Sequence, residues 1–252
     1  MKSAHPAHPG TSSIPAPKPK RFCWARRAAT GTIAGVSETQ GEIHLVLPDP
    51  IERAACFRVL AAGAARVVRS FASADDYLGA EADHGGGLLL LHWRQPGATS
   101  GSALLAHVAT RPDITAFVAA ERLSLDETRL ILRGGAFDLL PAPLDPRLVH
   151  RTLDPAFGDW QLCQRDRLMR RTAAARLAAL TPREVDILDA IAAGLGNKAI
   201  ARRLALSPRT VEVHRANIMR RAEAGSIAEL LRLRFIAESG RDTAENSFRF
   251  GA

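Results

Sequence analysis

Hydrophobic and polar positions alternate with two different periods along this chain of 252 residues. Between residues 41 and 152, apolar runs of five to seven residues are separated by segments whose apolar positions recur every three or four residues. The runs predict strands at Ile43–Leu47, 65–71, Gly87–His92, Ile114–Ala120 and Ala136–Leu140. The segments predict helices at Pro50–Ala62, Ser102–Thr110 and Leu125–Arg133, with another beginning at Asp145. Strands that alternate with helices in this way predict a doubly wound parallel sheet, the α/β flavodoxin-like fold.

Residues 179–239 carry only the helical period, and the starts of their helices are marked. Thr181 and Glu184 form a capping box in front of the first helix. That helix is predicted to place four apolar residues on its inward side: Val185, Leu188, Ile191 and Ala192. Short helices begin at Asn197 and Ser207, and Ser226 caps a last one. Two short helices joined by a tight turn, the second basic and capped, predict a helix-turn-helix within an all-α four-helix domain.

The helix Ser207–Arg221 has two clearly different sides. Val211 and Ile218 fall together on the side that would face a core. The opposite side carries Arg209, Glu212, Val213, Ala216 and Arg220. Guanidinium groups, an acid and small apolar groups together suit the base edges, thymine methyls and phosphates of a DNA major groove. Taken alone, the same mixture fits equally well the solvated face of an ordinary bundle helix.

Three strings in this region are distinctive: LTPRE at Leu180–Glu184, AGLGNKAIARRL at Ala193–Leu204 and LSPRTVEVHRANIM at Leu206–Met219. Through them, the span Leu180–Glu238 resembles the DNA-binding domain of LuxR/FixJ-type regulators, and most closely the FixJ branch. The resemblance implies that the third helix enters the major groove of double-stranded DNA and that the fourth often forms a dimer. The stripe for a homodimer would consist of Ile227, Leu230, Leu231 and Phe235.

The candidate DNA contacts fall into two sets. The residues expected to face bases are Arg209, Glu212, Val213 and Ala216, and the resemblance supports the last three. The residues expected to contact phosphates are Lys198, Thr210, His214, Arg215, Asn217 and Arg220. His214 and Arg215 lie toward the packed side of their helix, so a structural role is the alternative for both.

The strings IHLV and GGAFDLLPAPL, together with the FixJ-like domain that follows them, resemble a response-regulator receiver over about Glu42 to Arg151. The resemblance implies phosphoryl transfer to an aspartate, which needs acids for Mg²⁺, a carboxylate acceptor and a lysine. The receiver family places two acids after the first strand, the acceptor at the end of the third, Ser or Thr at the end of the fourth, and lysine before a proline after the fifth. Those positions here hold Leu47 and Pro48, His92, Ala120 and Ala142, and only Asp49 is acidic, one residue late.

His92 stands at the position of the acceptor. A neutral imidazole can act as a nucleophile, but without a Mg²⁺ cluster or a lysine nothing would stabilise the transferred group. We therefore favour His92 as a polar residue without chemistry and predict a pseudo-receiver that keeps the fold and has lost phosphorylation. No metal or cofactor is expected. The input would be the protein level, a regulatory protein partner on this domain, or a ligand at the carboxyl ends of the strands.

The basic residues are unevenly distributed, although the formal net charge is +8. Residues 1–27 hold six basic and no acidic residues, whereas residues 28–149 hold ten basic and fourteen acidic ones. Residues 150–178 and 179–238 are again basic in excess, with six against three and ten against seven. A polyanionic partner at the basic ends fits this distribution. A GC-rich genome would explain many arginines but not the acidic middle.

The remaining segments complete the expected domain organisation. Residues 1–40 and 240–252 are expected to be disordered tails around domains at 41–152 and 179–239. Residues 153–178 are expected to be a linker, helical over Asp159–Ala179, which either pairs in a dimer or is a solvated spacer. No apolar run approaches the ~20 residues needed to cross a bilayer. The widely spaced Cys23, Cys56 and Cys163 predict reduced thiols in a cytoplasmic protein.

The sequence allows three hypotheses about function. The first is a sequence-specific DNA-binding transcription regulator that acts as a homodimer. The second is a partner-binding module that sequesters a kinase or another regulator, and the third is an enzyme. The chain contains no catalytic triad, metal cluster, Walker loop or GxGxxG string, so an enzyme ranks last. The intact recognition helix favours the first function over the second.

Overall fold

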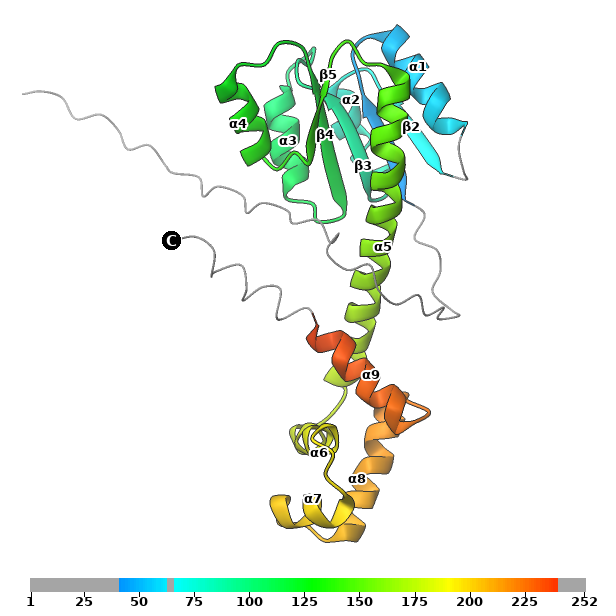
Figure 1. Ribbon diagram of the computed structural model, residues 1–252, viewed down its shortest axis with the longest axis vertical. Helices are drawn as coiled ribbons and strands as arrows, with labels where there is room; N and C mark the ends of the chain where they lie inside the picture. The colour runs from blue at the N-terminus through cyan, green and yellow to red at the C-terminus, as the bar shows by residue number, and fades with distance from the viewer. Residues whose placement is uncertain (1–40, 63–65, 240–252) are drawn as a thin grey trace, which may run out of the picture. The chain divides into compact units, whose positions relative to one another are not determined.

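The computed structural model describes residues 41–62 and 66–239. The tails predicted at 1–40 and 240–252, with Cys23, lie outside these residues. The chain divides into two compact units, Met1–Cys163 and Gln164–Ala252 (Figure 1). Within the described ranges, no helix combines the length and the apolar character that a membrane crossing requires.

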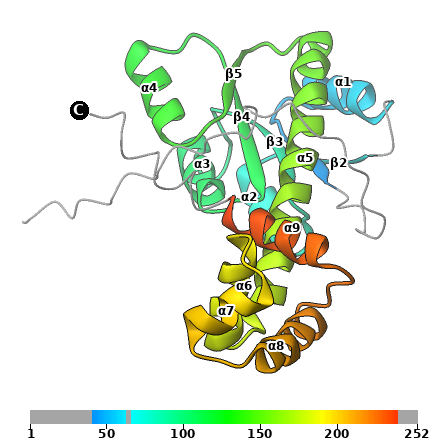
Figure 2. The ribbon, with the colours of Figure 1, turned by 60° about the horizontal axis from the view of Figure 1, so that its bottom comes forward.

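In its described residues, the first unit is a five-stranded parallel sheet with helices on both faces (Figures 1 and 2). Its strands are β1 (Glu42–Val46), β2 (Val67–Phe71), β3 (Gly87–His92), β4 (Ile114–Ala120) and β5 (Asp138–Pro141). Its helices are α1 (Pro50–Ala61), α2 (Ala74–Gly79), the 3-10 helix η1 (Glu81–Asp83), α3 (Gly101–Ala109), α4 (Leu125–Arg133) and the first part of α5 (Pro146–Ala178). The strand order β2-β1-β3-β4-β5 is that of flavodoxin-like folds, so the predicted fold class is confirmed.

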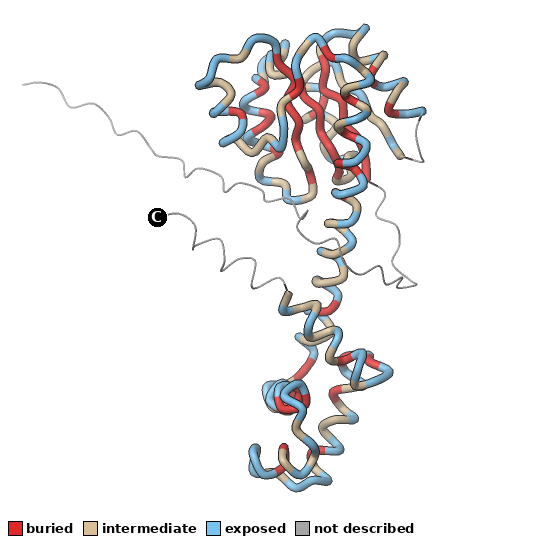
Figure 3. Tube along the Cα trace, in the orientation of Figure 1, coloured by how far each residue is buried: buried red, intermediate tan, exposed pale blue. Residues whose placement is uncertain are grey.

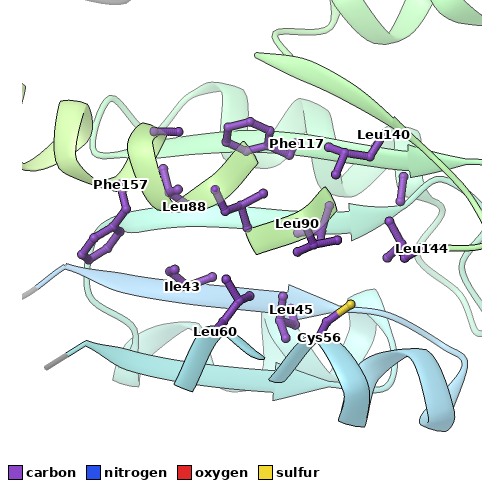
Figure 4. Close-up of a cluster of buried hydrophobic side chains, with 14 of the residues drawn as sticks. Ile43, Leu45, Cys56, Leu60, Leu88, Leu90, Phe117, Leu140, Leu144 and Phe157 are labelled. Atoms are coloured by element: carbon purple, nitrogen blue, oxygen red, sulfur yellow. The ribbon is translucent and has the colours of Figure 1, made fainter. Parts of the chain in front are cut away.

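Strand β3 occupies the centre of the sheet and is apolar on both faces, as a strand covered by helices on each side must be. Leu88 and Leu90 belong to a cluster covered by α1 and α5, whereas Leu89 and Leu91 belong to one covered by α2, α3 and α4. Figure 4 shows the first cluster, which Phe117 of β4 also enters. The central strands are buried along most of their length, as Figure 3 shows.

Helix α5 differs from the prediction of two helices, the second beginning at Asp159 inside a linker at 153–178. The structure forms one helix that continues through Pro155. Phe157 and Trp160 are buried in the core of the first unit. Burying side chains of this size contributes about 1.5–3 kcal/mol each, which offsets the ~3 kcal/mol that an interior proline costs. The linker prediction is therefore wrong up to Trp160, which belongs to the first domain.

The short helix α2 is an element that the hydrophobic pattern did not predict. The Ser73 hydroxyl caps it by accepting the N–H of Asp76 at 3.0 Å. Only Ala74 and Tyr77 of its residues are buried. Six residues make less than two turns, which is too short a segment for a helical period to be recognised.

The described residues of the second unit include α6 (Pro182–Ala192), α7 (Asn197–Leu204), α8 (Pro208–Arg221) and α9 (Ile227–Glu238), all of which Figure 2 labels. The capping box predicted in front of α6 is present. The helices enclose one core, whose members include Ile187, Leu188, Ile191, Ile200, Val211, Ile218 and Leu230. The predicted all-α four-helix domain is confirmed.

The inward side of α6 was predicted incorrectly at its edges. Val185 and Ala192 are exposed, whereas Ile187 and Ala190 are buried. The reason is Glu184, which is only 2% exposed and takes the inward position of the first turn. Because the prediction counted apolar side chains only, it could not assign this position to a carboxylate.

Candidate functional site

Helix α8 begins and faces as predicted. Ser207 Oγ accepts the N–H of Thr210 at 3.0 Å, and Pro208 follows at the first helical position. Val211 and Ile218 are fully buried and fix which side of α8 meets the core. The residues predicted for the outer side are all exposed: Arg209, Glu212, Val213, Ala216 and Arg220. They therefore form one continuous accessible surface on the helix, defined here as the α8 outer face.

Around the α8 outer face, the residues predicted for phosphate contacts differ in accessibility. Lys198 of α7 and Arg220 of α8 are exposed. Thr210 and Asn217 are partly buried and already bonded within α8 and its cap. The Thr210 hydroxyl lies 2.7 Å from Ser207 Oγ, and Asn217 Oδ1 accepts Arg220 Nη2 at 3.0 Å. Among the predicted phosphate contacts, Lys198 and Arg220 are thus the exposed cations, and Arg220 also donates to Asn217.

Arg215 and His214 have surroundings different from those of an outer-face residue. Arg215 is partly buried, and its Nη1 donates to Asn197 Oδ1 on α7 at 2.9 Å. His214 is also partly buried, and its Nδ1 is enclosed without a hydrogen-bond partner among the described residues. Two exposed guanidinium groups that the sequence analysis did not select, Arg202 and Arg203, lie on α7. The sequence signal that could have identified these two residues is the string ARR, residues 201–203.

Glu184 connects α6 to the recognition helix, a role that sequence reasoning missed. One carboxylate oxygen accepts the Thr181 N–H at 2.9 Å and the Thr181 hydroxyl at 3.0 Å. The other lies 3.6 Å from Arg221 Nε at the end of α8. Burial alone would raise the pKa of Glu184, but the bonds from Thr181 and the charge of Arg221 hold that pKa below its usual value. The ionised carboxylate thereby ties α8 to the start of α6.

The apolar stripe predicted for dimer formation on α9 is divided by the structure. Leu230 is fully buried in the core of its own unit, so its assignment to a dimer contact is corrected. Ile227 and Leu231 are partly buried and pack against the same core. Phe235 is 66% exposed. Of the four predicted residues, Phe235 is the one whose side chain is mainly available to a second chain.

The register of the first unit brings the six positions of the expected phosphorylation site to one edge of the sheet. His92 is paired with Ala119, and Ala120 with Pro141. Leu47 directly follows β1, whose last residue is paired with Leu91. The sixth position, Ala142, donates its N–H to the carbonyl of Ala120 at 2.9 Å. The positions that the resemblance selects therefore lie together at the carboxyl ends of the strands, and Asp49 is the one acid among them.

Asp49, the one acid among the six predicted positions, is already used in a helix cap. Asp49 Oδ1 accepts the N–H groups of Ile51 and Glu52, both at 2.8 Å, and starts α1. Leu47 is fully buried and has no polar side chain. Within the described part of the chain, no three His, Cys, Asp or Glu side chains are arranged to hold a metal ion.

Two side chains that the sequence analysis did not select occupy this edge. Arg53 Nη1 donates to the carbonyls of Leu47 and Pro48, the latter at 3.1 Å. Gln95 Nε2 donates to the carbonyls of Val46 at 3.2 Å and His92 at 2.7 Å. Gln95 Oε1 also accepts the N–H at the start of α2 at 2.9 Å. A guanidinium and an amide thus bind the strand-end carbonyls of β1 and β3 directly.

His92 makes a local contact at the same edge. Its Nδ1 lies 3.2 Å from the backbone nitrogen of Arg94, which donates to it. The ring therefore bonds to the loop that follows its own strand.

Both units are similar to known proteins. Residues 178–234 match the family model described as bacterial regulatory proteins, luxR family. The transcriptional regulatory protein FixJ of Rhizobium meliloti (strain 1021) is 30% identical over 197 residues, which cover 77% of this chain and 95% of that protein. FixJ of Bradyrhizobium diazoefficiens is 37% identical over 102 residues, which are 40% of this chain, so the chain spans about half the length of that relative. Among solved structures, the response regulator StyR has a TM-score of 0.64 at 25% identity, covering 77% of this chain and 98% of that one.

Proposed function

Because the chain belongs to the FixJ-type response regulators of the LuxR family, we propose that it is a sequence-specific transcription regulator whose receiver-like domain is not phosphorylated in the usual way. The observation that carries the DNA-binding part is the α8 outer face. Arg209, Glu212, Val213, Ala216 and Arg220 are exposed together on a capped helix whose opposite side is fixed in the core. A helix presented in this way is the element that enters a major groove.

The roles of the residues follow from their accessibility. Glu212, Val213 and Ala216 lie at the centre of the outer face and are proposed to meet base edges, with Arg209 beside them. Lys198 and Arg220 are proposed to contact phosphates, because both are exposed cations at the borders of this face.

The loss of phosphorylation is supported by the edge of the sheet. Asp49 is engaged in the cap of α1, and Ala142 has no amine that could pair with a phosphoryl oxygen. Arg53 places a guanidinium against the carbonyls of Leu47 and Pro48. A fixed positive charge opposes the binding of a second cation there, and phosphoryl transfer to an aspartate depends on such a cation. His92 is then a strand-end residue that stabilises the following loop.

The regulator is further proposed to act as a homodimer on two half-sites. Phe235 supports this part, since a large apolar side chain is exposed on α9. The input would reach the chain through its abundance, or through a protein or ligand at the carboxyl ends of the strands.

DNA binding is tested by selecting duplexes from fragmented genomic DNA with the purified full-length chain, and by measuring affinity against salt. We expect a small set of fragments to be enriched and the affinity to fall steeply as salt rises. Val213→Glu, which adds an acid to the α8 outer face, should abolish the enrichment. Leu130→Glu, a matched apolar-to-acid change at an exposed helical position of the first unit, should not. No enrichment by the unmodified chain would overturn the proposal.

A further inference from the structure

We propose that Arg215 is a positioning residue of the DNA-binding unit, which acts through Asn197 by fixing α7 against α8 and does not itself bind phosphate. This inference rests on the proposed function, because it concerns how the α8 outer face is held. It assigns to Arg215 one of the two roles that the sequence left open.

The place of Arg215 on α8 is the first argument. At 3.6 residues per turn, Arg215 lies about 60° around the helix from Glu212, which is on the outer face. It is also only about 40° from Val211, which is fully buried. The side chain is accordingly partly buried, whereas Arg209 and Arg220 are exposed. Arg215 thus stands at the border between the outer face and the core, and from there its guanidinium reaches Asn197 of α7.

The bond made by Arg215 is the second argument. Its Nη1 donates to Asn197 Oδ1 at 2.9 Å, and Asn197 is the first residue of α7. No side chain caps α7, since its N-cap residue is Gly196. An asparagine at a helix start commonly bonds to its own backbone, but here its side-chain oxygen accepts from the neighbouring helix. The start of α7 is thereby tied to the middle of α8.

The length of α7 explains why such a tie matters. With eight residues, α7 is far shorter than the ~12–15 residues that an isolated helix needs to be even marginally stable. Its far end is held in the same manner, because Arg183 Nη2 of α6 donates to the carbonyl of Leu204. Guanidinium groups from α8 and α6 therefore hold the two ends of α7.

The consequence for DNA binding follows from the next residue. Lys198 directly follows Asn197 and is exposed. The Arg215–Asn197 bond thus sets the position of a phosphate-contact candidate on α7 relative to the base-facing side of α8. Both must meet the same duplex at once, so a shift of α7 would lower the affinity for a specific site more than the affinity for any DNA.

The test compares Arg215→Ala, Asn197→Ala and the double variant in the full-length chain. The probes are a duplex selected from a random-sequence library by the unmodified chain and a scrambled duplex of the same composition. Asn197→Ala is the decisive variant because it removes the acceptor and keeps the positive charge of Arg215. Arg220→Ala, which removes an exposed cation from the outer face, is the matched control.

We expect each single variant to weaken binding to the selected duplex by up to about tenfold, because α7 must then be ordered on binding without its hydrogen bond to a charged group. Binding to the scrambled duplex should change much less, so the ratio of the two affinities falls. The double variant should be no weaker than the weaker single variant. The salt slope should stay unchanged for both singles, whereas Arg220→Ala should flatten it by about one unit.

The proposal is overturned if Asn197→Ala binds like the unmodified chain while Arg215→Ala flattens the salt slope, since Arg215 would then contact a phosphate. It is also overturned if both variants lower only thermal stability and leave the affinity ratio unchanged, because the bond would then stabilise the unit without setting its recognition surface. If the unmodified chain does not distinguish the two duplexes, the proposed function itself fails.

Discussion

Ala205 forms the turn between α7 and α8 in a backbone conformation that suits glycine. Its φ of 53° and ψ of 47° lie in the left-handed region, where the Cβ of an alanine crowds the following carbonyl. We expect Ala205→Gly to stabilise the second unit by about 0.5–1 kcal/mol, after allowance for the greater flexibility of glycine in the unfolded chain.

The change is measured as slower amide hydrogen exchange in α7 and α8. Ala193→Gly is the matched control, because Ala193 is also exposed at a helix end but has an ordinary φ of −75°. The control should be neutral or slightly destabilising. Equal exchange rates for Ala205→Gly and the unmodified chain would show that the turn is not strained.

His44 is a buried imidazole within a cluster of rings that includes Phe71, Tyr77 and His84. Its ring centroid is 4.9 Å from that of His84 and 5.6 Å from that of Tyr77. Burial, followed by the repulsion that a charged His84 would add, lowers the pKa of His44 to about 4 from 6.5. The nearby Glu42 carboxylate, 3.3 Å from His44 Nε2, opposes the shift but does not offset the burial.

Because the pKa of His44 is lower in the folded chain than in the unfolded chain, acid destabilises the fold through this residue. The His44 imidazole takes up its proton near pH 6.5 in the unfolded chain and near pH 4 in the folded chain. The contribution of His44 to stability is therefore complete above pH 6.5 and is lost as the pH falls to about 4. The loss reaches about 2–3 kcal/mol at the acid end.

We expect His44→Phe to make this acid slope shallower, because the phenyl ring stacks without titrating. Tryptophan fluorescence in denaturant titrations at several pH values reports on the first unit, since the three tryptophans precede residue 164. Phe71→Leu should lower stability equally at all pH values and keep the slope. A His44→Phe slope as steep as that of the unmodified chain would contradict the assignment.

At the scale of elements, two variants of the α8 outer face should affect DNA binding in different ways. Arg220→Ala removes a cation at the border of the face, so binding to all sequences should weaken alike and the salt slope should fall by about one unit. Glu212→Ala removes a carboxylate proposed to meet a base edge, so it should change which sequences are preferred. Library selection and salt titration with each variant measure both effects. Unchanged affinity and preference in both would place the DNA on another surface.

Helix α9 carries both a core residue, Leu230, and the exposed Phe235 that is proposed for the dimer contact. Phe235→Glu should leave the unit folded, because the side chain is 66% exposed, and should abolish cooperative binding to a duplex with two half-sites. Leu230→Ala, in the core, should instead destabilise the unit by about 2–5 kcal/mol. Analytical ultracentrifugation on the duplex distinguishes one bound chain from two. Wild-type cooperativity in Phe235→Glu would move the dimer contact elsewhere.

Much of the element order could be predicted because periodicity and caps are local properties of the sequence. Helix α8 was predicted from its cap at Ser207 and Pro208 and from the apolar positions Val211 and Ile218. The structure confirms that helix and its inward side. Helix α5 could not be predicted through Pro155, because what keeps it helical is its packing against the sheet.

The candidate site could be predicted from the sequence only where the type of the side chain is decisive. The sequence shows that Leu47 and Ala142 lack the groups of a receiver. It does not show that Arg53 and Gln95 bind the strand-end carbonyls, because those bonds depend on loop conformation. Asn197 and Arg215 are likewise 18 residues apart in the sequence, and only the packing of α7 on α8 makes them partners.

At the scale of the whole molecule, the chain combines a receiver-type sheet with a LuxR-family helix-turn-helix unit, and the proposed loss of phosphorylation would remove the usual connection between them. A working receiver is a switch because a bound cation and a transferred phosphoryl group shift a two-state equilibrium. Here the same edge of the sheet holds Arg53, Gln95 and a capping Asp49. The acidic excess of residues 28–149 would suit a basic protein partner, which we propose as the input in place of phosphorylation.

The most direct test measures the affinity of the full-length chain for its selected duplex, with and without acetyl phosphate and Mg²⁺, and takes intact masses from the same samples. The account predicts an unchanged Kd and no phosphoryl adduct, because neither Leu47, Pro48 nor Ala142 can hold the groups that transfer requires. A phosphoryl adduct that disappears in His92→Ala or Asp49→Asn, accompanied by a change in Kd, would contradict it.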